Sequence, residues 1–403
     1  MAQGTDPDDV VRLRLKSQML REPGAASPED ALGNLLAVQA QEFAYARWSL
    51  AQRTSAQGTS GPTPAATAAD VELAVADGRI LRTHILRPTW HFVHRDDLRW
   101  LMVLSAPRLH QANAGMYRTT RINAAAAERS GQVLAEAVRG GNHLTREQLA
   151  VRLQDAGFAA KGVELAYLIM HAEISAVLVS GTPVRSPGGA LKQTYALFDE
   201  RVPPGPDAPL SRPLSRAESL AELVRRYFTS RGPATVKDCS DWSGLTMADI
   251  RHGLLNALED DRAALETTVI DGVEFYSSAE TDAGAAPAPG RPFVDLIQCY
   301  DEYVMGYSAT RHYLGGTAPA IPADGALMHV VLLNGRMIGS WRHVLLPGRC
   351  ELDIRLSTSA APASAATAER LDAAVDDAVA RYAAFLGIPA TRVQSGAKLE
   401  GHI

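Results

Sequence analysis

Apolar and polar positions alternate most regularly in the middle of the chain. Apolar side chains at helical spacing mark three stretches there, residues 126–139, 144–158 and 161–176. Thr145, followed three positions later by Gln148, is a capping-box pattern, which predicts the start of the second helix. Residues 177–198 read as two strands around a glycine-containing loop. Three helices followed by a hairpin are the layout of a winged helix, so we predict one here.

The same order of elements recurs on both sides of this segment. Downstream, the pattern predicts three helices and a hairpin, at residues 219–230, 234–245, 246–260 and 264–278. Asp271-Gly272 within that hairpin suits a type I′ turn. Upstream, Ser27 and Pro28 predict the start of a helix. A further helix and a hairpin are predicted at residues 67–78 and 79–94. The chain therefore predicts three winged-helix units.

The C-terminal part follows a different pattern. It predicts a hairpin, a strand and a closing helix, at residues 328–344, 350–357 and 366–386. Four stretches rich in Pro, Gly, Ser or Ala read as linkers, at residues 54–67, 199–214, 281–292 and 357–366. We therefore expect an α+β protein of three tandem winged-helix units and a β-rich C-terminal domain. The expected domain boundaries are 1–125, 126–214, 215–292 and 293–403.

Composition narrows the class of protein. Of the 403 residues, 46% are hydrophobic and 21% are charged, which is typical of a soluble globular protein. The three cysteines, Cys239, Cys299 and Cys350, form no CxxC pair, so we expect neither a zinc site nor disulfides. This cysteine usage favours a location in the reducing cytoplasm. The N-terminus lacks the features of a signal peptide, and no apolar run reaches about 18 residues, so we expect no membrane span.

The distribution of charge favours a nucleic-acid partner. The net charge of −5 excludes a histone-like polycation but leaves room for a local basic channel. Residues 98–127 contain no acid but include Arg118 and Arg121, and residues 325–350 contain no acid but include Arg342. Such stretches suit contact with phosphates, and a solvated basic face is the alternative. Because a winged helix usually reads DNA, we expect these three arginines to bind it.

Two glutamines interrupt the first apolar helix. In LLAVQAQ, Gln39 and Gln41 are separated by one alanine. On a regular helix, their side chains would point about 200° apart. The two amides can face one site only if the helix ends or bends at this place.

Four segments together resemble a known family. LLAVQAQ with the following WSL, RILRTHILRPTWHFV, DEYVMGY and GRMIGSWR are similar to segments of the AlkZ and YcaQ-like winged-helix DNA glycosylases. The resemblance runs from about residue 10 to residue 386. It implies tandem winged helices around a C-shaped DNA-binding channel, and a catalytic motif of Gln, an apolar residue, then Gln or Asp. Gln39-Ala40-Gln41 matches the Gln version of this motif. It also implies release of bulky N7-alkylguanines or interstrand cross-links from DNA, as repair or as antibiotic self-resistance.

The chemistry of glutamine agrees with such a substrate. Glutamine has no useful pKa, so it is neither a general acid nor a general base. An N7-alkylated guanine already carries positive charge and leaves without protonation, while the sugar becomes cationic. Two amides could then stabilise that charge and hold the attacking water. No lysine lies near the motif, so we expect a monofunctional glycosylase for which neutral bases such as uracil are poor substrates.

The TWH segment of the predicted hairpin is a second candidate. It resembles the Thr-Leu-His segment of the family, so we expect Thr89, Trp90 and His91 near the DNA. His91 would contact a phosphate or make a hydrogen bond within the hairpin. Trp90 would stack on a base or belong to the core. His84 and His94 lack a convincing spacing for a metal, and we expect both at the surface.

Two adjacent acids are a third candidate. Asp301 and Glu302 begin DEYVMGY, and one carboxylate could support catalysis as a base or by stabilising charge. Alternatively, the pair caps a turn or binds an arginine. Neither a metal nor an organic cofactor is implied.

Other functions remain open at this point. A winged-helix transcription regulator is the main alternative, although it would typically dimerise on a palindromic site and would not need paired glutamines. An antibiotic-sequestering protein is a third possibility. Tandem units make a dimer unnecessary, so we expect a monomer that binds duplex DNA carrying alkylated guanine.

Overall fold

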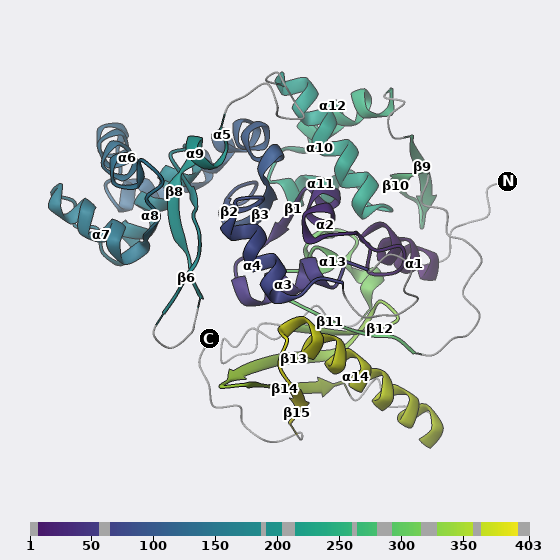
Figure 1. Ribbon diagram of the computed structural model, residues 1–403. Helices are drawn as coiled ribbons and strands as arrows, with labels where there is room; N and C mark the ends of the chain where they lie inside the picture. Colours follow the sequence, from purple (N-terminus) through teal and green to yellow (C-terminus); the bar gives the residue numbers. More distant parts are fainter. Residues whose placement is uncertain are drawn as a thin grey trace.

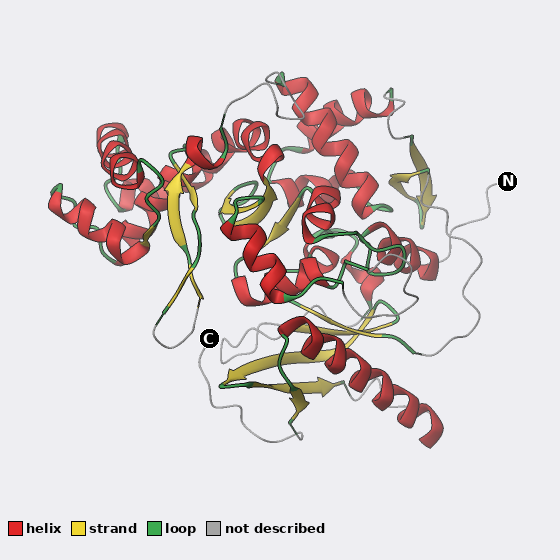
Figure 2. Cartoon of the chain, in the orientation of Figure 1, coloured by secondary structure: helices red, strands yellow, loops and turns green. Residues whose placement is uncertain are grey.

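The computed structural model describes most of the chain, namely residues 7–55, 65–186, 191–203, 214–259, 264–279, 292–315, 329–357 and 364–393. Most of each predicted linker lies outside these residues. Several small, mainly antiparallel sheets are surrounded by helices (Figures 1 and 2), which confirms the expected α+β class. Within the described part, none of the helices has the length and apolar character needed to cross a membrane.

The N-terminal segment forms a three-stranded sheet with helices around it. Its helices are α1 (Pro7–Ser17), α2 (Pro28–Leu35), α3 (Phe43–Ala51) and α4 (Ala68–Ala76). Its strands are β1 (Ala37–Gln39), β2 (Ile80–His84) and β3 (Trp90–His94), in the antiparallel order β1-β3-β2. The Ser27 side chain accepts from the Asp30 N–H and Pro28 lies in the first turn, which confirms the predicted start of α2.

The second segment begins with a long helix that the sequence pattern did not indicate. This helix is α5 (Arg95–Thr119). The helices α6 (Ala124–Val138), α7 (Arg146–Asp155), α8 (Gly162–Ile174) and α9 (Phe198–Arg201) follow. Strands β4 (Leu144–Thr145), β8 (Thr194–Leu197) and β5 (Leu178–Ser180) form one sheet, and β6 (Val184–Arg185) pairs with β7 (Leu191–Lys192). Thr145 and Gln148 cap α7 reciprocally, which confirms the predicted capping box.

The third segment contains three helices and a hairpin in the predicted order. They are α10 (Arg216–Arg231), α11 (Val236–Ser243), α12 (Met247–Leu258), β9 (Leu265–Ile270) and β10 (Val273–Ser278). Asp271 and Gly272 both have positive φ, at 50° and 77°, as the predicted type I′ turn requires. The number of winged helices and the C-shaped channel stay predictions.

The C-terminal segment forms a five-stranded sheet. Its strands are β11 (Val294–Ile297), β12 (His329–Leu333), β13 (Arg336–Leu346), β14 (Arg349–Leu356) and β15 (Ala390–Arg392), paired in that order. Two short helices, α13 (Glu302–Met305) and η1 (Arg311–Leu314), follow β11. Helix α14 (Ala365–Leu386) packs against this sheet (Figure 1). A turn at Asn334-Gly335 joins β12 to β13, which confirms the hairpin predicted over residues 328–344.

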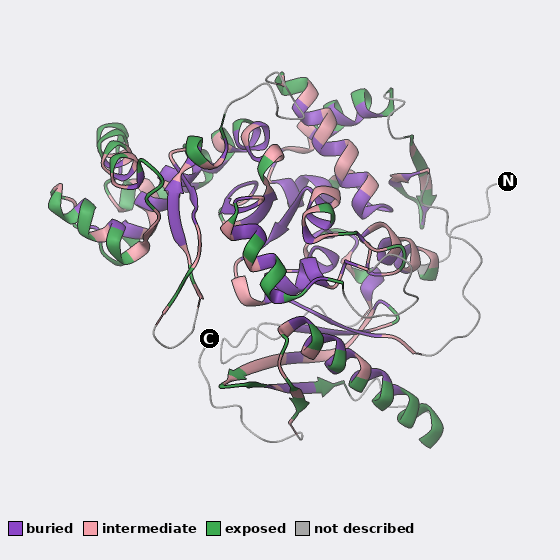
Figure 3. Cartoon of the chain, in the orientation of Figure 1, coloured by how far each residue is buried: buried purple, intermediate pink, exposed green. Residues whose placement is uncertain are grey.

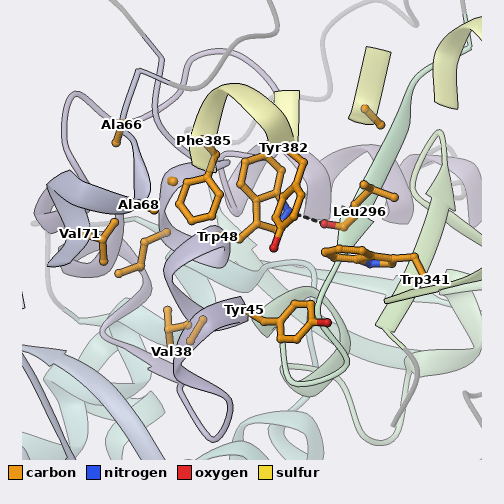
Figure 4. Packing of buried hydrophobic residues seen from close by; sticks show 14 of the residues in the cluster. Val38, Tyr45, Trp48, Ala66, Ala68, Val71, Leu296, Trp341, Tyr382 and Phe385 are labelled. Carbon is orange, nitrogen blue, oxygen red and sulfur yellow. Dashed lines mark hydrogen bonds between the residues drawn. The ribbon is translucent and has the colours of Figure 1, made fainter. Parts of the chain in front are cut away.

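The first and last segments share one apolar core. Trp48 of α3 packs against Tyr382 and Phe385 of α14, and its indole Nε1–H donates to the Leu296 carbonyl at 2.6 Å (Figure 4). A second core joins the β2–β3 hairpin and α5 to α10 and α11. Burial is therefore concentrated in the central elements, whereas α6 and α7 expose their outer faces (Figure 3). The glutamine motif lies where these two cores meet, with Val38 in the first and Ala37 in the second.

Candidate active site

The apolar helix that precedes the glutamines ends before it reaches them. Helix α2 stops at Leu35, and Leu36 has a positive φ of 64°, which turns the chain into β1. Gln39 is the last residue of β1 and pairs with His91 of β3, and the Ala40 N–H extends the ladder to the Trp90 carbonyl at 2.7 Å. Gln41 follows in a bend, two residues after the strand ends. The two amides are therefore released from helical geometry, which would have pointed them about 200° apart.

Gln39 is held by three segments that are distant in the sequence. Its side chain is buried, and its side-chain oxygen accepts a hydrogen bond from Nη2 of Arg87 at 2.8 Å. Its backbone N–H donates to Oε1 of Glu302 at 2.9 Å, and its carbonyl accepts from Nε2 of Gln298 at 3.3 Å. Both ends of its peptide unit and its amide oxygen are therefore fixed.

Gln41 is fixed through its backbone rather than through its side chain. Arg82 is buried and donates to the carbonyls of Ala40 at 2.8 Å and Gln41 at 3.2 Å. Burial lowers the pKa of Arg82 to about 10, and its guanidinium lies 4.5 Å from the Trp90 ring. The half-buried Gln41 side chain makes only a long contact, 3.4 Å from its oxygen to the Trp90 N–H. Among the described residues, the amide nitrogen of neither glutamine has an acceptor, and Gln41 is the more exposed of the two.

Glu302 and Asp301 are buried and bound to arginines. Oε2 of Glu302 accepts from Nη2 of Arg231 and Nε1 of Trp242, each at 2.6 Å. Asp301 caps α13 and binds Arg53 through both oxygens, at 2.6 and 2.9 Å. Burial alone would raise the pKa of Asp301, but the charge and hydrogen bonds of Arg53 outweigh it and lower that pKa. Asp301 therefore caps α13 and pairs with Arg53. Glu302 pairs with Arg231 and holds the Gln39 backbone through a hydrogen bond.

The TWH segment faces inward for the most part. His91 is fully buried, with Nδ1 2.9 Å from the Thr89 carbonyl and Nε2 3.3 Å from Nη2 of Arg87. Burial and the charge of Arg87 hold the pKa of His91 well below its usual range, so the ring is neutral. Trp90 is half-buried between Arg82 and His84. His91 therefore makes the hydrogen bond within the hairpin, and its ring is not presented to a phosphate in this structure.

The remaining predicted residues lie in different surroundings. Arg118 and Arg121 are exposed at the C-terminal end of α5. Arg342 on β13 is half-buried, and its Nε is 3.5 Å from Oδ2 of Asp353. The prediction of a surface position for His84 is wrong, because the ring is buried with Nδ1 2.6 Å from Oε2 of Glu173. The buried glutamate supplies a partner that the local sequence does not reveal.

The sequence reasoning missed the residues that hold the motif in place. Arg82 lies in the buried strand β2 and Arg87 in the turn that follows it, and a charged residue in a buried strand is a usable signal of a structural or functional role. Arg231, Trp242 and Gln298 give no such local signal, because they approach the motif only in the folded chain. Within the described residues, no cluster of three or more His, Cys, Asp or Glu side chains could hold a metal ion.

Comparisons with known proteins identify the family of this chain. A family model described as "DNA glycosylase AlkZ-like" matches residues 32–385. A Streptomyces sahachiroi protein named "Interstrand DNA cross-link repair glycosylase" is 24% identical over 355 residues, which are 83% of this chain and 87% of that protein. The solved structure of the Streptomyces sahachiroi DNA glycosylase AlkZ is similar to this one with a TM-score of 0.70 and 20% identity, over 97% of this chain and all of that one. At this identity, the structural likeness supports a common fold.

Proposed function

Because this chain belongs to the AlkZ-like DNA glycosylase family, we propose that it hydrolyses the N-glycosidic bond of N7-alkylguanine in duplex DNA. Membership of the family makes it a monofunctional DNA glycosylase that acts on N-glycosyl bonds, and sets aside the alternatives of a regulator and of a sequestering protein. The observation that carries the finer proposal is that two neutral amides, Gln39 at the end of β1 and Gln41 in the bend after it, come at this point of the fold.

The two amides have different parts in this proposal. The side-chain oxygen of Gln39 is bound to Arg87, so its NH₂ group faces away from that arginine. The Gln41 side chain is held only by a 3.4 Å contact, so its oxygen is free to turn toward the sugar. Gln41 stabilises the developing oxocarbenium charge and accepts a hydrogen bond from the attacking water. Gln39 donates to the water oxygen and fixes its position.

The leaving group explains why amides suffice. An N7-alkylguanine is cationic before the bond breaks and becomes neutral as it leaves, so no proton has to be supplied. Neutral amides also avoid a fixed carboxylate beside the base, which would stabilise the cationic ground state. Asp301 and Glu302 act as positioning residues, because both are buried and bound to arginines.

We extend the proposal to bulky adducts and interstrand cross-links. The relative from Streptomyces sahachiroi carries cross-link repair in its name. The Gln41 loop is only half-buried, and an open site suits a lesion that is too large or too tethered to be turned into a closed pocket. The biological role in this proposal is repair of, or self-resistance to, an alkylating antibiotic.

Base release tests the proposal directly. Purified protein is incubated with duplex DNA carrying one N7-alkylguanine, and alkali then converts abasic sites into strand breaks. We expect breaks at the adducted guanine, and a loss of about a hundredfold or more in the single-turnover rate for Gln41→Ala. Gln39→Ala is expected to lose a similar amount, whereas Gln154→Ala, on the exposed face of α7, is expected to match the wild type. Near wild-type rates for both motif variants would contradict the mechanism.

A further inference from the structure

A small pocket opens beside the glutamine motif. It has a volume of about 250 Å³ and lies between the β2–β3 turn, the middle of α5 and the residue that follows α11. Arg87, Arg108 and Gln111 line it, together with the backbone around Leu86 and Gly244. Arg87 is the residue that also binds the Gln39 side chain. The pocket and the motif therefore share one guanidinium.

The polar lining of the pocket is cationic. Arg108 is exposed, and no described residue pairs with it, while no carboxylate is among the described residues that line the pocket. Arg87 uses its Nη atoms toward Gln39, His91 and the Trp242 carbonyl. A guanidinium has five N–H donors, so Arg87 can also donate to a ligand without releasing Gln39. Two cations at one pocket repel each other, and an anion between them would remove that repulsion.

The backbone fixes the shape of this pocket. Leu86 and Gly244 both have positive φ, at 62° and 70°. A Cβ atom at Gly244 would lie 2.5 Å from the Leu86 carbonyl oxygen, so only glycine allows the two backbones to approach this closely. The turn that carries Arg87 is thereby held against the end of α11, opposite Arg108.

Basic residues continue from the pocket along α5. Arg108, Gln111 and Arg118 are all exposed and lie within about 80° of each other around the helix. Arg108 and Arg118 are about 15 Å apart along the helix axis. This distance is long enough for contact with more than one phosphate of a DNA strand.

We infer that this pocket binds a backbone phosphate of the damaged DNA strand, with Arg108 as its direct ligand and Arg87 joining that phosphate to Gln39. The inference rests on the proposed function, because an enzyme that acts on DNA would meet a DNA phosphate as the anion at this pocket. It assigns to the pocket the task of placing the lesion, because a phosphate bound there sets the position of the adjoining sugar relative to the two amides. Arg108 contributes to affinity rather than to the chemical step, and Arg87 contributes to both.

The test combines a variant with a neutral phosphate analogue. The affinities of the wild type, Arg108→Ala and Arg108→Lys for adducted duplex are measured at several salt concentrations. Methylphosphonate then replaces each phosphate near the lesion in turn. For Arg108→Ala we expect affinity about tenfold lower and a salt slope smaller by about one, with partial recovery in Arg108→Lys. One methylphosphonate position should weaken the wild type but leave Arg108→Ala unchanged.

The controls separate this inference from the proposed function. Arg370→Ala, on an exposed part of α14 outside the pocket, should match the wild type in affinity and salt slope. If Arg108→Ala also matches the wild type, or if every methylphosphonate weakens both proteins equally, the pocket does not bind phosphate. If the wild type releases no base while the Arg108 effects persist, the proposed reaction fails and the phosphate site stands.

Discussion

Nη2 of Arg87 donates a hydrogen bond of 2.8 Å to the side-chain oxygen of Gln39. A guanidinium group only donates and an amide oxygen only accepts, so this contact decides which end of the amide faces the substrate. The same Nη2 lies 3.3 Å from Nε2 of the neutral His91. One arginine therefore orients a motif side chain and the buried ring of the adjacent strand together.

We predict that replacing Arg87 lowers the rate of base release more than it lowers DNA affinity. Without the guanidinium, the Gln39 amide can rotate, and misplacement of a reacting group costs about tenfold to a hundredfold in rate. Single-turnover rates at saturating enzyme should fall in Arg87→Ala and recover in part in Arg87→Lys, which keeps one donor. An unchanged rate at saturation, with only weaker binding, would show that Arg87 does not orient Gln39.

We predict that Glu302 stabilises the fold as well as the site. Its carboxylate accepts from Arg231, Trp242 and the Gln39 N–H in a fully buried position. Glu302→Ala leaves the Arg231 charge buried without its partner, which costs about 3–5 kcal/mol in the free energy of unfolding. Urea denaturation measures this change, and Glu369→Ala on the exposed face of α14 is the matched control. A loss below about 1 kcal/mol would mean that Arg231 finds another partner.

We predict that the charge of the damaged base controls release. Duplex DNA with N7-methylguanine should yield abasic sites, and the same duplex with uracil should yield none, because uracil leaves as an anion unless it is protonated. Glu42 follows the motif, and burial raises the pKa of its carboxyl, so it is a candidate for supplying a proton. Uracil release that disappears in Glu42→Gln would show that the enzyme does use an acid.

We predict that stability falls as the pH drops below about 6.5. Burial lowers the pKa of His329 to about 3 and that of His343 to about 4. These rings stay neutral in the folded protein while the unfolded chain takes up protons, so each histidine removes up to about 1.4 kcal/mol per pH unit below the unfolded pKa. The pH dependence of urea unfolding between pH 7 and pH 5 measures this slope.

His329→Asn supplies the comparison for that slope. Nδ1 of His329 accepts from the Cys299 N–H at 3.1 Å, and an asparagine oxygen can replace this acceptor without titrating. The variant should lose stability less steeply with falling pH than the wild type does. Equal slopes in the two proteins would show that His329 is not part of the effect.

We predict that Arg118 and Arg121 contribute to DNA affinity more than Arg342 does. The first two are exposed near the end of α5, whereas Arg342 has Asp353 as a neighbour at 3.5 Å. Arg118→Glu and Arg121→Glu should each weaken binding and reduce its salt dependence, and Arg342→Ala should change both less. Fluorescence titration of labelled duplex at three salt concentrations checks the order, and a larger loss for Arg342→Ala would reverse it.

Local patterns predicted local structure well. Thr145 with Gln148, and Asp271-Gly272, carry the physical reason for a cap and a turn within a few residues, and both predictions are confirmed. The first helix does end before Gln39, which meets the condition set by two amides at a spacing that cannot share a helix face. Helix α5 was missed because Pro107 lies inside it and because the polar residues Ser105 and Asn113 occupy buried positions on its inner face.

Long-range partners could not be predicted from the sequence. Glu302 contacts Gln39 across 263 positions, and nothing near either residue indicates the other. His84 looked like a surface residue because its partner, Glu173, lies on α8, 89 positions away. The roles expected for Gln39, Gln41 and the DNA-binding residues stay predictions until the variants are measured.

The dependence of Gln39 on Glu302 and Gln298 has a consequence during translation. The ribosome makes the glutamine motif early, but the two residues that hold its backbone come about 260 positions later. Until those residues have emerged, the Gln39 backbone lacks both of these hydrogen bonds, and the first segment lacks the C-terminal half of its apolar core. A chain ending before residue 293 would therefore carry the complete motif in its sequence without the contacts that order it.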